Sequence, residues 1–234
     1  MSYEAIELEL ALEDAPSPVV SAAVHAPVRQ SGPAVLLTPG AGGSYDGAPL
    51  TGLADVLASL GCTVVRANLP HHQLGRRAPR AESSVPGYRA VLAAARAQVA
   101  PQASWVAGGK SYGGRVATLA AVDDALEVAG LILHGYPLHP PGKPDQLRVD
   151  HWHRIPIPVL FLQGTRDPFG SAHELEEHLT KLPRRATLLA VEGGDHTLDV
   201  AGVHAPDGVR RPAAEVLERS AEPIATWLRV LADS

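Results

Sequence analysis

The sequence predicts an α/β fold, in which a doubly wound and mostly parallel sheet forms one domain over residues 1–234. Short apolar runs alternate with helical patterns, as crossover units of a parallel sheet require. The length of 234 residues suits one large domain, which buries about 70% of its unfolded surface and needs no disulfide or metal to fold. Cys62 is the only cysteine, so an intramolecular disulfide is excluded.

The predicted strands and helices follow one another along the whole chain. Residues 6–12 alternate between apolar and polar, and residues 19–24 provide an antiparallel partner across a proline-containing turn. The later apolar runs are nearly continuous, as in strands that are buried on both faces. They cover residues 34–38, 62–67, 104–107, 131–134, 159–162 and 187–191. Helical patterns cover residues 48–60, 84–99, 113–122, 172–181 and 213–231.

Two irregular stretches, residues 68–86 and 136–156, interrupt this alternation. Loops of this length in a compact domain are usually functional. Neither is long enough for a multi-helix cap domain, so we expect an open active site.

Charge and hydropathy limit the partners and the location of the protein. The net charge of −5 and the pI near 6.1 argue against a nucleic-acid partner. No apolar run approaches the roughly 20 residues needed to span a bilayer, and the acidic N-terminal segment is unlike a signal peptide. We therefore expect a cytoplasmic protein without a membrane partner, and the abundant alanine and arginine indicate a bacterial source. The oligomeric state is left open.

The most informative motif is Gly-x-Ser-x-Gly at residues 109–113, which lies between an apolar strand and a helical pattern. This context is typical of a nucleophile elbow, with Ser111 as the nucleophile. A glycine-rich turn that happens to contain serine is the simpler alternative. A phosphate-binding loop is the other, but Ser104 stands where that motif requires glycine. We expect Lys110 to point away from the turn, into solvent or toward a neighbouring carboxylate.

A serine nucleophile needs a base and an acid that orients it, and in this arrangement they follow in the order Asp, then His. Asp167 comes just after the strand at 159–162, and His196 comes just after the strand at 187–191. Asp167 could instead cap the helix that begins near Ser171. Asp195 is the rival carboxylate, and we interpret it as structural because a neighbour in sequence rarely reaches the ring.

Further residues are expected around this triad. The glycine-rich segment 39–43 suggests the backbone amide of Ala41 as one oxyanion donor, and Tyr112 after the nucleophile is the other. Tyr136, His139 and Lys143 follow the strand at 131–134 and are candidates for substrate binding, or else belong to a loop that prolines fix. No metal site and no cofactor are predicted, because the histidines and carboxylates lack convincing ligand spacing.

Taken together, these motifs resemble the α/β-hydrolase superfamily over nearly the whole chain. More narrowly, the chain looks like the small branch without a cap domain that includes dienelactone-hydrolase-like bacterial proteins. It also resembles the hydrolase-like domain in a subunit of a nuclear histone-acetylating complex. The finer resemblance depends on residues 39–43, 66–70, 75–77, 108–114, 136–143 and 163–167. Dienelactone hydrolases use a cysteine nucleophile, so their substrate does not transfer to Ser111.

The resemblance implies the same triad of Ser111, Asp167 and His196. The predicted function is hydrolysis of an ester, or of a thioester or amide, through an acyl-enzyme, with a small acyl compound as substrate. Two other functions stay open. One is a non-catalytic protein-binding scaffold on the same fold. The other is acyl transfer or perhydrolysis by the same residues.

Overall fold

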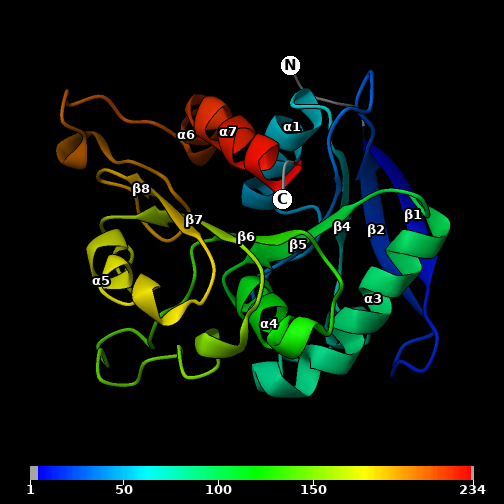
Figure 1. Ribbon diagram of the computed structural model, residues 1–234. Helices are drawn as coiled ribbons and strands as arrows, with labels where there is room; N and C mark the ends of the chain where they lie inside the picture. The colour runs from blue at the N-terminus through cyan, green and yellow to red at the C-terminus, as the bar shows by residue number, and fades with distance from the viewer. Residues whose placement is uncertain (1–4, 233–234) are drawn as a thin grey trace.

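The computed structural model describes residues 5–232, which form an eight-stranded sheet with helices on both faces (Figure 1). The strand order is β1-β2-β4-β3-β5-β6-β7-β8. β1 and β2 form an antiparallel hairpin, β2 pairs antiparallel with β4, and every pair from β4 to β8 is parallel. The strands are β1 (Ala5–Ala11), β2 (Val19–His25), β3 (Ala34–Thr38), β4 (Thr63–Ala67), β5 (Trp105–Lys110), β6 (Gly130–His134), β7 (Val159–Gly164) and β8 (Ala186–Val191). The predicted mostly parallel α/β sheet is confirmed.

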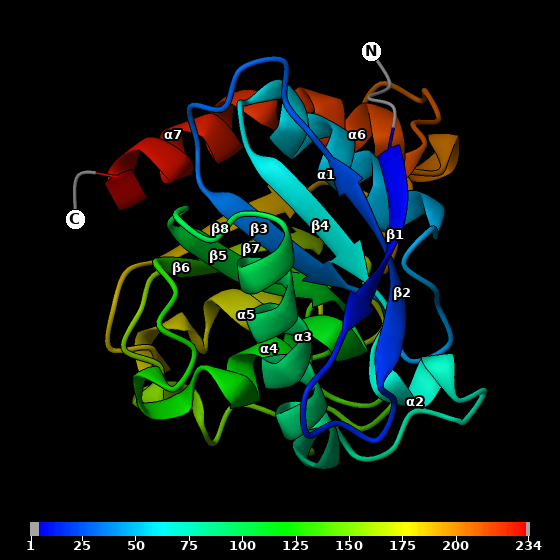
Figure 2. The same cartoon turned by 90° about the vertical axis from the view of Figure 1, so that its right-hand side faces the viewer.

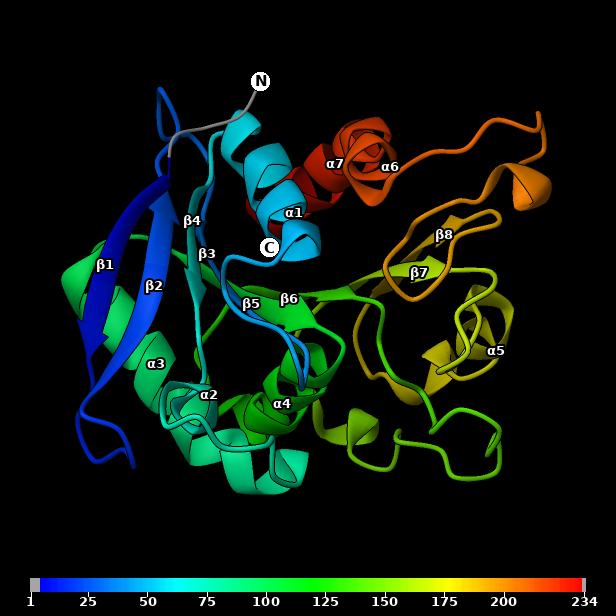
Figure 3. The ribbon, with the colours of Figure 1, turned by 180° about the vertical axis from the view of Figure 1, so that it is seen from behind.

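The helices cover the sheet in two groups. α1, α6 and α7 lie on one face, and α3 and α4 lie on the other (Figures 1 and 3). Seen from the side of β1 and β2, these two layers lie above and below the strands (Figure 2). The helices are α1 (Ala48–Ser59), α2 (Pro70–Gln73), α3 (Val85–Gln98), α4 (Tyr112–Ala120), α5 (Ala172–Glu176), α6 (Ala213–Arg219) and α7 (Ala221–Ala232). The fold is therefore doubly wound, as predicted.

Successive side chains of the central strands supply two hydrophobic cores. In β3, Leu36 packs toward α3 and α4, whereas Val35 and Leu37 pack toward α1, α6 and α7. All three side chains are fully buried, and burial of such a side chain stabilises the fold by about 1.5–3 kcal/mol. Burial on both faces explains why the apolar runs in the sequence are continuous rather than alternating.

The helical pattern at 213–231 forms two helices rather than one. α6 ends at Arg219, and α7 begins at Ala221. Pro223 lies in the first turn of α7, where its missing N–H is tolerated. In one continuous helix, the same proline would remove a hydrogen bond to the Arg219 carbonyl and clash with it.

Three other segments differ from their predicted form or refine it. The pattern at 172–181 gives only α5 and one 3₁₀ turn at Leu179–Lys181. Within 68–86, the structure has α2 and a 3₁₀ turn at Ala81–Ser84. Residues 136–156 contain a single 3₁₀ turn, at Trp152–Arg154.

The predicted domain covers residues 1–234, of which 1–4 and 233–234 lie outside the part that the structure describes. Within residues 5–232, none of the helices combines the length and the apolar character that a bilayer span needs.

Candidate active site

Ser111 occupies a sharp turn between β5 and α4, at the carboxyl edge of the sheet. Its φ of 49° and ψ of −112° lie in a region that side-chain-bearing residues rarely adopt. The turn also packs tightly against β3. A Cβ atom at Gly109 or at Gly113 would lie 2.4 Å from the carbonyl oxygen of Thr38. Both glycines of the motif are therefore required by close approach to Thr38.

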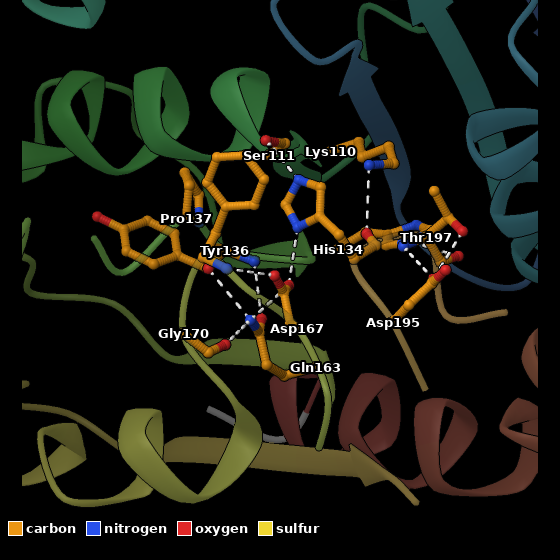
Figure 4. Close-up of polar contacts among 12 residues, drawn as sticks. Lys110, Ser111, His134, Tyr136, Pro137, Gln163, Asp167, Gly170, Asp195 and Thr197 are labelled. Atoms are coloured by element: carbon orange, nitrogen blue, oxygen red, sulfur yellow. Dashed lines mark hydrogen bonds and ion pairs between the residues drawn. The ribbon is translucent and has the colours of Figure 1, made fainter. Parts of the chain in front are cut away.

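The loops after β7 and β8 bring Asp167 and His196 to Ser111 (Figure 4). The His196 Nε2 atom lies 2.9 Å from Ser111 Oγ, and the Nδ1 atom lies 2.8 Å from Asp167 Oδ2. Since a carboxylate only accepts, the hydrogen of the neutral ring is on Nδ1. Nε2 is then free to accept the hydroxyl proton of Ser111.

The carboxylate of Asp167 is buried and held by more than the imidazole. Gln163 Nε2 donates to Asp167 Oδ2 at 2.9 Å, and the backbone N–H of Phe169 donates to Oδ1 at 2.8 Å. Gln163 also accepts from the Tyr136 N–H at 2.7 Å and donates to the Gly170 carbonyl at 2.7 Å. These contacts fix the orientation of Asp167 relative to the ring of His196.

Sequence reasoning did not single out Gln163 as a site residue. Its side chain is fully buried at the end of β7. The available signal was a long polar side chain that directly continues the apolar run at 159–162. A buried amide at such a place needs partners, and here the partners belong to the site.

Asp195, the rival carboxylate, contacts its own loop (Figure 4). Its Oδ1 atom accepts from the backbone N–H of Thr197 at 2.7 Å, from the Thr197 hydroxyl at 2.8 Å and from the Asp199 N–H at 3.1 Å. These bonds shape the turn that carries His196. The ring of Phe169 packs against the His196 ring, with centroids 4.4 Å apart.

The residues predicted as oxyanion donors lie beside the nucleophile. Tyr112 is the first residue of α4, so its N–H has no partner within the helix. Ala41 lies in the loop 39–44, which lines a cleft of about 360 Å³ together with Ser111 and His196. A Cβ atom at Gly40 would lie 3.5 Å from the Ser111 Cβ, so this loop runs close to the nucleophile.

Two polar side chains at the end of β4 hold the loop that contains Ala41. The Asn68 Oδ1 atom accepts from the Tyr45 N–H at 2.9 Å, and the Arg66 guanidinium donates to the Tyr45 carbonyl. Arg66 is itself buried and donates to His25 Nε2 at 2.8 Å. The segment next to the cleft is thus anchored to β4 and the residue after it through both the N–H and the carbonyl of Tyr45.

The expectation that Lys110 points into solvent or toward a carboxylate is wrong. Its side chain is half-buried and lines the cleft, and its Nζ atom donates to the carbonyl oxygen of His196 at 3.3 Å (Figure 4). Burial lowers the pKa of Lys110, whereas Asp167 and Asp195 act in the opposite direction. The ammonium donates to the backbone of His196, and the sequence alone did not predict this contact.

His134 lies behind this contact and was not singled out by the sequence. Its ring is fully buried, and Nε2 lies 3.3 Å from the carbonyl oxygen of Thr197. Burial and the nearby Lys110 charge lower the pKa of His134 to about 3. The ring is therefore neutral near pH 7.

The structure places the side chain of Tyr136 in the core, and it does not place His139 or Lys143 at the cleft. The side chain of Tyr136 is fully buried, packs against Trp152 and donates to the Arg148 carbonyl at 2.6 Å. His139 is also buried, and its ring nitrogens lie near the carbonyl of Pro140 and the carboxylate of Glu174.

Lys143 is exposed in the turn that follows. None of Tyr136, His139 and Lys143 is among the described residues that line the cleft with Ser111. The sequence did not predict the aromatic packing that turns Tyr136 inward.

Among the described side chains, no three His, Cys, Asp or Glu residues gather as a metal site would require. The arrangement at Ser111 is chemically sufficient for nucleophilic attack that an imidazole assists. It needs a hydroxyl, a base within hydrogen-bond reach and an acid that orients the base.

Comparison with known proteins agrees with the fold described above. A family model described as an alpha/beta hydrolase domain matches residues 31–228. A serine hydrolase without a lid from Xanthomonas campestris shares 22% identity at a TM-score of 0.69, covering 96% of this chain and 95% of that one.

Two further solved structures resemble the chain. A dienelactone hydrolase from Anabaena variabilis shares 16% identity at a TM-score of 0.71, covering 98% of each chain. The esterase domain of a Rhodothermus marinus protein shares 16% identity at a TM-score of 0.67, covering 97% of this chain and 98% of that one. At these identities, the likeness to solved structures establishes the fold.

Proposed function

The chain belongs to the α/β-hydrolase family, and from that premise we propose that it cleaves an ester through an acyl-enzyme formed on Ser111. The observation that carries the proposal is the ring of His196, which bridges Ser111 Oγ at 2.9 Å and Asp167 Oδ2 at 2.8 Å. The solved structures similar to this chain include proteins named as a serine hydrolase, a dienelactone hydrolase and an esterase domain, which supports the same reaction class.

The first half of the reaction forms the acyl-enzyme. Ser111 Oγ attacks the carbonyl carbon of the ester while its proton moves to His196 Nε2. The charged imidazole that results donates from Nδ1 to Asp167, whose buried carboxylate stabilises it. When the carbon–oxygen bond of the ester breaks, the alkoxide leaves with the proton that His196 returns.

Negative charge develops on the carbonyl oxygen during attack. The backbone amides of Tyr112 and Ala41 are the donors we assign to it, and the first turn of α4 adds a favourable dipole. Loss of one such donor typically raises the barrier by about 3 kcal/mol. The hydrogen bonds of Arg66 and Asn68 to the Tyr45 backbone hold the loop that contains Ala41 in position to donate to this oxygen.

The second half of the reaction releases the acid. A water molecule takes the place of the leaving alcohol, His196 removes its proton, and the hydroxide attacks the acyl carbon. Ser111 then leaves as a hydroxyl with that proton. The cleft of about 360 Å³ lies at the lower end of the usual range for ligand sites, so we expect small acyl groups.

Hydrolysis of p-nitrophenyl esters of graded chain length tests this function, with Ser111→Ala measured beside the wild type. We expect turnover by the wild type, fastest with short chains, and a loss of at least about 1,000-fold in Ser111→Ala. Equal rates for the two proteins would contradict the mechanism. In the presence of an added alcohol, the proportion of product that is free acid rather than a new ester distinguishes hydrolysis from acyl transfer.

A further inference from the structure

One lysine, Lys110, lines the cleft beside Ser111. Its described lining consists of the glycine-rich loop 39–43, Ser44, Gly47, Pro49, Leu50, Lys110, Ser111 and His196. Among these residues, Lys110 is the only Lys, Arg, Asp or Glu. A substrate in the cleft therefore meets apolar and glycine surfaces, the reacting groups and a single ammonium.

The ammonium of Lys110 is incompletely satisfied by the protein. It has three N–H donors, and its hydrogen bond goes to the neutral carbonyl of His196 at 3.3 Å. Among the side chains that the structure describes, no carboxylate lies within ion-pair distance of it. The two carboxylates that act on it from further away, Asp167 and Asp195, are already engaged by other donors.

A half-buried cation with no anionic partner is costly for the free protein. Removing a charge from water is unfavourable unless an opposite charge or several hydrogen bonds replace the water. The bond from Lys110 to the His196 carbonyl replaces only part of that hydration, and a neutral donor would suffice for it. The position thus favours a ligand that brings its own negative charge.

We propose that Lys110 binds a carboxylate of the substrate, so that the preferred esters carry a carboxylate a few carbons from the reacting carbonyl. Half-esters of short dicarboxylic acids have this chemistry. The linker is short because Lys110 directly precedes Ser111 and its ammonium bonds to the backbone of His196. This inference rests on the proposed hydrolase function and adds a substrate class to it.

The test compares two esters that differ chiefly in charge, monomethyl glutarate and dimethyl glutarate. The measured quantity is the ratio of kcat/KM for the charged ester to that for the neutral one. A charge-assisted hydrogen bond in a partly buried site gives a preference of about 10- to 100-fold, so we expect a ratio in that range for the wild type. Monomethyl succinate and monomethyl adipate establish the length of the linker.

Variants separate charge recognition from support of the His196 loop. Lys110→Met should lower the ratio to about one or below, whatever happens to the absolute rates. Lys110→Arg should restore most of it, because it keeps the positive charge. Lys181→Met is the matched control, since Lys181 is an exposed lysine outside the cleft lining, and its ratio should equal that of the wild type. Added salt should lower the wild-type ratio but leave that of Lys110→Met unchanged.

The outcomes distinguish this inference from the function on which it rests. A wild-type ratio near or below one, or a ratio that Lys110→Met leaves unchanged, overturns the role of Lys110 while dimethyl glutarate hydrolysis still supports the serine hydrolase. Absence of hydrolysis of either ester, with Ser111→Ala no different from the wild type, overturns both.

Discussion

The backbone of Ser111 offers a sharp test of how the nucleophile is held. With φ at 49° and ψ at −112°, this residue occupies a conformation that glycine adopts readily and other residues do not. Such strain costs about 1–3 kcal/mol. Ser111→Gly should relieve it, whereas Ser111→Ala retains the Cβ atom and the strain. Both variants lose the hydroxyl and its contact with His196, so the comparison between them isolates the backbone.

The expected difference follows from two opposing effects. Relief of strain favours the glycine variant, and the greater freedom of glycine in the unfolded chain opposes it by about 0.4–1 kcal/mol. Taking the middle of each range, Ser111→Gly should be more stable than Ser111→Ala by about 1 kcal/mol, and both should lack esterase activity.

Urea unfolding followed by circular dichroism measures this difference directly, because the two variants share the same chain length and the same missing hydroxyl. A glycine variant less stable than the alanine variant would refute the argument that the sheet holds Ser111 in a strained turn.

Three other predictions concern the surroundings of the triad. Gln163→Leu removes a hydrogen-bond donor from the buried carboxylate of Asp167. It should lower the free energy of unfolding, measured by urea titration, by about 2 kcal/mol, and it should also lower kcat. An unchanged unfolding midpoint and an unchanged kcat would contradict the role of Gln163 in holding Asp167. His134 has a pKa of about 3 in the folded protein and near 6.5 when unfolded, so the unfolded chain binds its proton first as the pH falls. The stability present above pH 6.5 should therefore decline toward pH 3 by up to about 1.4 kcal/mol per pH unit, and His134→Gln should flatten this slope. Asn68→Ala leaves the Tyr45 N–H without its acceptor and should lower kcat/KM for a neutral ester about tenfold. A change in stability with an unchanged kcat/KM would mean that the loop containing Ala41 does not depend on Asn68 for its position.

The order of elements and the triad were largely accessible from the sequence. Strands buried on both faces leave continuous apolar runs, and the runs at 34–38, 159–162 and 187–191 match β3, β7 and β8 closely. Parallel strands bring their carboxyl ends to one edge, so residues after them meet without knowledge of any contact. Ser111, Asp167 and His196 follow three such strands, and the structure brings them within hydrogen-bond distance.

What the sequence missed depends on which way individual side chains turn. Tyr136 follows β6, but its ring packs against Trp152, 16 residues further along the chain, and is buried in the core. Lys110 reaches the backbone of His196, a contact between residues 86 positions apart. Gln163 donates a hydrogen bond to Asp167, and the local pattern of apolar and polar residues does not predict that contact. The finer resemblance to a nuclear complex subunit stays a prediction.

In the proposed mechanism, His196 and Asp167 activate Ser111 as a nucleophile. Treatment of the folded protein with a fluorophosphonate, followed by peptide mass mapping, measures that reactivity at one atom. We predict a single adduct on Ser111 that forms quickly in the wild type and is nearly abolished in His196→Ala. An unmodified Ser111, or an adduct that forms equally fast without His196, would contradict the account.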